Sequence, residues 1–152
     1  MKLVNKMKLK KVFLYLLLLV VCFSFKDVYA KEQVKLYFFH GDGCPHCAEE
    51  EKFLEKIEKK YKNVKIIEYE VWYNKSNAML MNRVGGKYDA STNSVPLTVI
   101  SSTAITGYSE SVGTKIERAI KYYENNKKEN IDYVSKIKNG TYNKDKKEFY
   151  PH

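Results

Sequence analysis

The sequence predicts an α/β domain, and three observations support this fold class. Apolar strand patterns and amphipathic helix patterns alternate along the chain in the order β-α-β-α-β-β-α. A Cys-x-x-Cys motif, Cys44-Pro45-His46-Cys47, lies between the first strand and the first helix. A proline, Pro96, opens the third strand, where a missing backbone N–H does least harm.

The first 30 residues predict a secretory signal peptide, because their composition differs from that of the rest. Lysines crowd the first eleven positions, and the 14 residues from Val12 to Phe25 carry no charge. That run is shorter than the roughly 20 residues that span a bilayer. Val28-Tyr29-Ala30 offers small residues for cleavage. An uncleaved anchor at 1–30 is the alternative, and both deliver the domain outside the cytoplasm.

The strand and helix that flank the motif follow from residue type and spacing. Residues 34–40 form a β-branched and aromatic run, which predicts a buried strand. Apolar residues recur at helical spacing from Phe53 to Tyr61, which predicts an amphipathic helix over residues 48–61. Acidic residues come first in this helix and lysines later, an order that suits the helix dipole.

The remaining elements continue the alternation. The pattern predicts strands at residues 64–72, 95–100 and 103–106, and helices at residues 75–84 and 112–123. Gly85-Gly86 is expected to end the helix before it. Gly107 breaks the fourth strand, and Ser109 or Ser111 caps the last helix.

Residues 31–126 are therefore predicted to form the folded domain, and residues 127–152 a basic polar tail that is helical in part. Without residues 1–30 the formal net charge falls from +9 to +4, since 21 basic and 17 acidic residues remain. So mild a surplus does not predict the concentrated basic face of a nucleic-acid-binding protein.

The Cys-x-x-Cys motif itself predicts a dithiol redox switch. Cys44 lies where the N–H groups and dipole of a helix N-terminus stabilise a thiolate. Cys47 lies about one helical turn later, close enough to form a disulfide with it. Such a disulfide closes a very short loop and therefore adds little stability. The only other cysteine, Cys22, belongs to residues 1–30.

The element order, the motif, Val95-Pro96 and Gly107 together resemble the thioredoxin superfamily over residues 34–123. This resemblance implies a central four-stranded mixed sheet flanked by helices. It also implies that Cys44 is an exposed nucleophile and Cys47 a buried resolving thiol. Pro96 would be cis, and its loop would face the motif and hold the substrate chain.

The Pro45-His46 dipeptide is similar to that of DsbA-type disulfide oxidases. There His46 would stabilise the Cys44 thiolate and make the disulfide a better oxidant. Two features depart from the family patterns. Only about two dozen residues separate the second strand from Pro96, too few for the inserted helical domain of DsbA. The apolar run 36–39 lacks the acidic residue that many superfamily members bury on the first strand to move the resolving thiol's proton.

Other site types fit the sequence less well. Structural zinc needs four ligands and usually a second cysteine pair, so His40 and His46 do not predict a metal site. Covalent haem would need His directly after Cys47, where Ala48 stands. Four aromatic residues are interpreted as parts of the core and its rim rather than as a binding site: Tyr37, Trp72, Tyr73 and Tyr108.

We therefore expect a monomeric thiol–disulfide oxidoreductase outside the cytoplasm, secreted or tethered to the outer face of the cytoplasmic membrane. Its substrates would be exported cysteine-containing proteins, which it oxidises, and a membrane redox partner would serve it. No organic cofactor is expected beyond the Cys44–Cys47 disulfide. A reductase or isomerase with a membrane partner is the alternative. An alternative from a different functional class is a binding module without redox activity, which holds an exported peptide.

Overall fold

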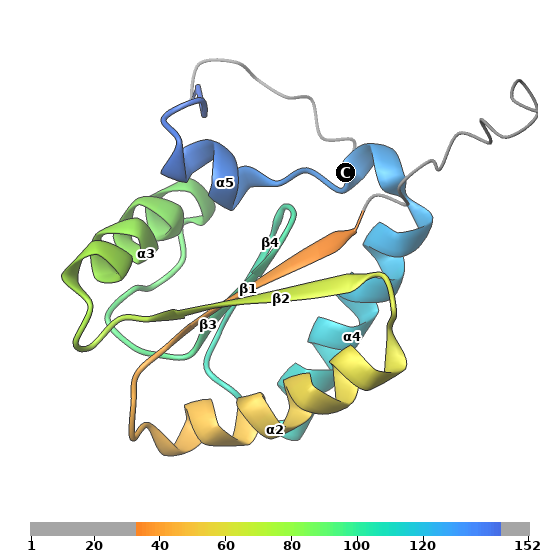
Figure 1. Cartoon of the computed structure of the whole chain (residues 1–152), viewed down its shortest axis with the longest axis horizontal. Coiled ribbons are helices and arrows are strands. Elements are labelled where there is room, and N and C mark those ends of the chain that lie inside the picture. The colour runs from red at the N-terminus through yellow and green to blue at the C-terminus, as the bar shows by residue number, and fades with distance from the viewer. Residues whose placement is uncertain (1–32, 144–152) are drawn as a thin grey trace, which may run out of the picture. The chain divides into compact units, whose positions relative to one another are not determined.

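A computed structural model describes residues 33–143, which form an α/β fold (Figure 1). The main elements are β1 (Val34–His40), α2 (Pro45–Lys60), β2 (Val64–Glu70), α3 (Lys75–Tyr88), β3 (Leu97–Ile100), β4 (Thr103–Thr106) and α4 (Glu110–Asn125). The 3-10 helix η1 (Lys127–Glu129) and the short helix α5 (Tyr133–Lys138) follow. The predicted order β-α-β-α-β-β-α is confirmed, with two short helices added after it.

The four strands form one mixed sheet in the order β2-β1-β3-β4. Strand β1 is parallel to β2 and antiparallel to β3, which in turn is antiparallel to β4. As a central strand β1 is buried on both faces, which explains its continuous apolar run. Leu36 and Phe38 belong to one core, and Tyr37 and Phe39 to the other.

Two helices cover each face of the sheet. Helices α2 and α4 bury Leu54, Ile57 and Ile116 in the first core. Helices α3 and α5 bury Leu80 and Val134 in the second, on the opposite side of the strands in Figure 1. This arrangement is consistent with the predicted thioredoxin-like fold, and it brings the carboxyl end of β1 and the start of α2 to one edge of the sheet.

Two predicted helix boundaries were wrong. Helix α2 begins at Pro45, three residues before the predicted start, because Cys44 is already its N-cap. Helix α3 continues through Gly85-Gly86 and ends at Tyr88, and its C-cap Asp89 has a left-handed φ of 51°. Gly85 has a packing reason instead, since a Cβ there would lie 2.2 Å from Thr92 Cγ2.

The described part of the predicted tail is packed. Tyr133, Val134 and Ile137 of α5 are buried. Just before the helix, the Asp132 carboxylate accepts hydrogen bonds from Lys35 Nζ at 2.6 Å and from the Tyr37 hydroxyl at 2.8 Å. The segment therefore closes the second core against β1.

The predicted signal peptide at residues 1–30 lies outside the described residues, and so does the end of the predicted tail. None of the helices between residues 33 and 143 combines the length and the apolar character needed to cross a membrane.

A candidate dithiol redox site

A tight turn after β1 delivers Cys44 to the N-terminus of α2. The Cys44 backbone N–H donates to the Gly41 carbonyl at 3.0 Å. Between them Gly43 has a φ of +86°, which L-residues rarely adopt, so the turn requires glycine there. Pro45 occupies the first helical turn, where a missing N–H breaks no helical hydrogen bond. The Cys44 sulfur is thereby fixed at the positive end of the helix.

The two sulfurs lie within one helical turn, as predicted. The Cys47 backbone N–H donates to Cys44 Sγ at 3.4 Å, so the thiol acts as the side-chain cap of α2. Both cysteines are free thiols in this structure. An N–H donor and the helix dipole favour negative charge on the Cys44 sulfur.

The structure corrects the exposure expected for the nucleophile. Cys44 is only 7% exposed, little more than the 4% of Cys47, because the loop before Pro96 covers it. Burial, together with the Cys44 thiol, raises the pKa of Cys47 to about 12, and the negative charge of Glu50 adds to the rise. A Cys47 thiolate is thus costly, and the thiol holds its proton.

The loop that faces the motif contains the cis peptide bond that the resemblance implies. Val95–Pro96 is cis, which confirms that expectation. The Cys44 thiol donates to the Val95 carbonyl with an Sγ–O distance of 3.9 Å. The structure therefore brings together Cys44, Cys47, Val95 and Pro96 from two distant parts of the chain.

His46 lies on the solvent side of the motif. Its side chain is 68% exposed, and its Nδ1 lies 3.9 Å from the Glu49 carboxylate. The effect of His46 on the Cys44 thiolate stays a prediction, and the charge of the neighbouring Glu49 contributes to it as well.

Sequence reasoning missed one functional candidate, Glu50. This residue is fully buried, and the Thr98 hydroxyl donates to its Oε1. Its Oε2 has no hydrogen-bond partner within residues 33–143, which is costly for a buried carboxylate. Burial raises the pKa of Glu50 from 4.5 to about 7, although the Thr98 hydrogen bond opposes the rise.

The position of Glu50 links the cysteines to the cis-proline strand. Glu50 follows Cys47 by three residues, on the same face of α2, and its charge acts on the Cys47 thiol. Thr98 stands in β3, two residues after Pro96. The first strand has no acidic residue, as the sequence shows, and the buried acid near the cysteines is Glu50 of α2.

A helical stripe could have identified Glu50 in the sequence. The buried residues of α2 are Cys47, Glu50, Leu54 and Ile57, spaced as one face of a helix. The three consecutive glutamates 49–51 concealed this stripe, because together they look like a solvated acidic first turn.

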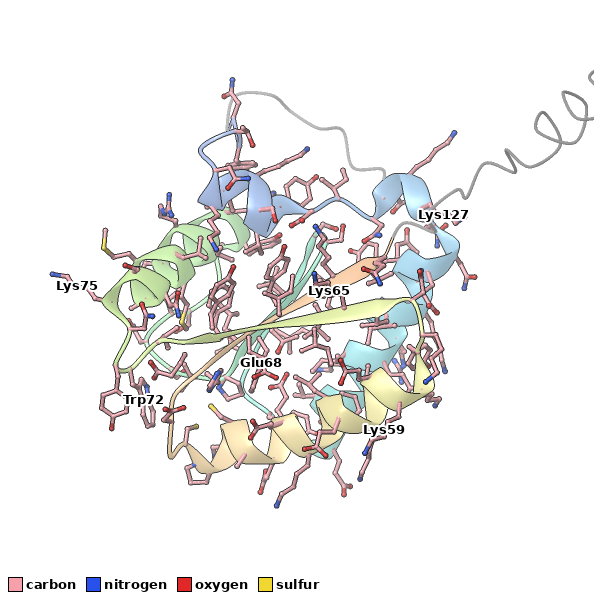
Figure 2. The ribbon with its side chains drawn as sticks, viewed as in Figure 1. Lys59, Lys65, Glu68, Trp72, Lys75 and Lys127 are labelled. Atoms are coloured by element: carbon pink, nitrogen blue, oxygen red, sulfur yellow. The ribbon has the colours of Figure 1, made fainter. Side chains whose placement is uncertain are left out.

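Two exposed aromatic residues flank the turn. Trp72 is 53% and Tyr73 81% exposed, and Figure 2 shows Trp72 beside the connection between β1 and α2. The Trp72 ring packs on Gly41, where an added Cβ would lie 2.2 Å from its Cδ2. Of the aromatic set interpreted as core and rim, Tyr37 is core, and the exposed Trp72 lies next to the site.

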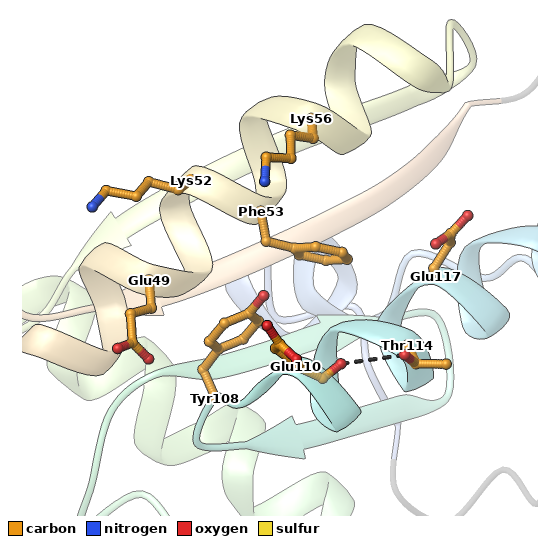
Figure 3. A pocket seen from close by; sticks show the side chains of 8 residues that line it. All are labelled: Glu49, Lys52, Phe53, Lys56, Tyr108, Glu110, Thr114 and Glu117. Carbon is orange, nitrogen blue, oxygen red and sulfur yellow. Dashed lines mark hydrogen bonds between the residues drawn. The ribbon is translucent and has the colours of Figure 1, made fainter.

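A hollow lies between α2 and α4, and neither cysteine lines it (Figure 3). Phe53 and Tyr108 line it, with ring centroids 5.8 Å apart. Glutamates and lysines surround them, so the hollow has no dominant charge. No group of three metal-ligating side chains that could hold an ion occurs in residues 33–143.

Comparisons with known proteins found a structural likeness but no matching family. No protein-family model matches the chain, and no curated protein matches it. Among solved structures, the chain is similar to the glutaredoxin Grx-1 from Archaeoglobus fulgidus, with 19% identity and a TM-score of 0.44. That match covers 61% of this chain and 96% of the glutaredoxin.

Proposed function

We propose that this chain is a thiol–disulfide oxidoreductase that acts outside the cytoplasm and oxidises cysteine-containing exported proteins. One observation carries the proposal. Cys44 Sγ sits at the N-terminus of α2, within reach of Cys47 and of the Val95 carbonyl before cis-Pro96. The sequence of residues 1–30 supports delivery outside the cytoplasm.

Oxidation of a substrate would proceed in two balanced steps from the Cys44–Cys47 disulfide. A substrate thiolate attacks Cys44 Sγ, the bond to Cys47 breaks, and a substrate–Cys44 mixed disulfide forms. A second substrate thiolate then attacks the substrate sulfur and releases Cys44 as a thiolate, which the N-terminus of α2 stabilises. The substrate loses two electrons and the cysteine pair gains them. A membrane redox partner would take them away.

Glu50 supplies the proton that the first step needs. Cys47 leaves as a thiolate, and its pKa of about 12 means that it must be protonated at neutral pH. With a pKa near 7, the Glu50 carboxyl group can either donate or accept a proton at neutral pH. The protonated Glu50 gives its proton to Cys47 and becomes a carboxylate, and reoxidation of the pair reverses the transfer.

The reduction potential of the Cys44–Cys47 pair, measured in graded glutathione buffers, tests the proposal. A potential well above the thioredoxin value of about −270 mV supports an oxidase. A value near −270 mV contradicts it and favours a reductase or isomerase with a membrane partner. The Cys44→Ser variant is the control, since exchange must stop without this sulfur. Binding of exported peptides that survives this substitution, with no exchange in the native chain, would indicate a binding module.

A further inference from the structure

A small recess opens between the Trp72 loop, helix α3 and the loop before Pro96. Its volume is about 230 Å³. The apolar part of its lining comes from Val71, Trp72, Ala78, Met81 and Val95. The other lining residues carry amide or hydroxyl groups, and no charged side chain lines it.

Two residues join the recess to the nucleophile. Val95 lines the recess, and its carbonyl accepts from the Cys44 thiol. Trp72 lines it too, and its ring packs on Gly41, whose carbonyl accepts the Cys44 N–H. Neighbouring residues of an extended chain lie about 3.3–3.6 Å apart along it. Because Val95 contacts both Cys44 and the recess, a polypeptide whose cysteine has reacted with Cys44 has its neighbouring residues within reach of the recess.

The aromatic wall of the recess is fixed before a substrate arrives. The Glu70 carboxylate accepts the backbone N–H groups of Trp72 at 2.7 Å, Tyr73 at 3.0 Å and Asn74 at 3.0 Å. These hydrogen bonds lower the pKa of Glu70, which stays ionised at neutral pH. A preformed loop that exposes tryptophan loses little conformational entropy on binding, and tryptophan is a frequent anchor of interfaces.

Size and charge define what the recess accepts. Pockets that enclose whole small molecules measure on the order of 300–1,000 Å³, so this one suits a single side chain. The lining has no cation to pair with the two carboxylates of glutathione, whereas its apolar wall can cover an apolar side chain. We propose that the recess selects polypeptides with an apolar side chain next to the reacting cysteine, and that it disfavours glutathione.

This inference rests on the proposed function and deepens it. Two dithiol peptides that differ only in the residue next to the reacting cysteine, leucine or aspartate, provide the test. The oxidised full chain is mixed with each peptide, and disulfide formation is followed by chromatography to obtain kcat/KM. We expect the leucine peptide to react about tenfold faster, the size of a moderate interface anchor.

Two variants change the recess in opposite ways. Trp72→Ala opens one wall, and Ala78→Leu fills the recess with a good helix former on α3. Both should reduce the preference for leucine to about onefold, and oxidation of the small dithiol dithiothreitol by the Ala78→Leu chain checks that the cysteine pair itself still reacts. Tyr122→Ala, which removes an exposed aromatic residue of α4, should keep the preference.

The outcomes separate the inference from the function. Equal rates for both peptides in the native chain overturn the recess and leave the oxidoreductase intact. Variants that slow both peptides and dithiothreitol equally also overturn it, because the side chains then only support the fold. The recess is also overturned if glutathione disulfide reacts as fast as the disulfide form of the leucine peptide. No exchange with any thiol overturns the proposed function itself.

Discussion

Replacing Glu50 by glutamine removes the ionisable group buried between α2 and β3 and keeps its shape. The folded protein holds the carboxyl proton until about pH 7, whereas an ordinary glutamate loses it near 4.5. Glutamine has no proton to lose in this range. The substitution therefore changes how stability depends on pH, and it also removes the proposed proton donor of Cys47.

The sign follows from the raised pKa. Below pH 4.5 Glu50 is protonated in both the folded and the unfolded chain, and its contribution to stability is fully present. Between 4.5 and about 7 only the folded chain keeps the proton, so stability falls as pH rises. The fall amounts to about 3 kcal/mol and is complete above pH 7. The Glu50→Gln variant does not show this fall. Between pH 4 and pH 8 its free energy of unfolding therefore rises by about 3 kcal/mol relative to that of the native chain.

Urea denaturation of the reduced protein at several pH values measures this difference. Most other titrations cancel between the two chains. Cys47 has its pKa near 12, and burial and the Glu50 charge raise that of Tyr108 above its usual value. Glu51→Gln, on the exposed side of α2, is the matched control and should show no such change. A difference between Glu50→Gln and the native chain that is the same at pH 4 and pH 8 refutes the reasoning.

The same variant should lose activity while it gains stability at pH 8. Without a donor for Cys47, peptide oxidation near pH 7 should slow by about 100-fold, the lower range of general acid–base catalysis. Stopped-flow rates across pH 5–9 measure this, and the native chain should show an inflection near pH 7 that the variant lacks. An unchanged profile would mean that water protonates Cys47.

Two further predictions concern the turn and the cysteines. Cys47→Ser should accumulate mixed disulfides on Cys44, visible as slower bands on non-reducing gels, whereas Cys44→Ser should accumulate none. Gly41→Ala should displace the Trp72 ring, since the new Cβ would lie 2.2 Å from it. Because Trp72 is the only tryptophan, its emission should shift to longer wavelength, and unchanged emission would show that the ring does not rest on this turn.

The sequence predicted those parts of the fold that depend on local pattern. β1 has a continuous apolar run at residues 36–39 and α4 has one apolar stripe, so both could be identified with their approximate bounds. The site followed from the spacing of Cys44 and Cys47. The contact with Val95 came only from the resemblance, because nothing local to residue 95 indicates a partner 51 positions earlier.

What the sequence concealed depends on tertiary contacts. Glu50 stands between two exposed glutamates, and only the packing of α2 on β3 shows which of the three is buried. The segment around α5 is rich in lysine, yet Tyr133 and Val134 are buried because α3 and β1 leave a face for them to cover. Local polarity predicted a tail there, and long-range packing made it part of the core.

The Asp132 contacts also determine when this chain can finish folding. Tyr37 and Asp132 are 95 positions apart, and their hydrogen bond joins the central strand to a segment near the end of the described chain. Contacts this distant form slowly, since closing so long a loop costs entropy before the contact itself can offset that cost. If the chain is exported from its N-terminus as we propose, the second face of β1 would stay exposed until α5 had followed it, and Cys44 and Cys47 would emerge well before the fold was complete.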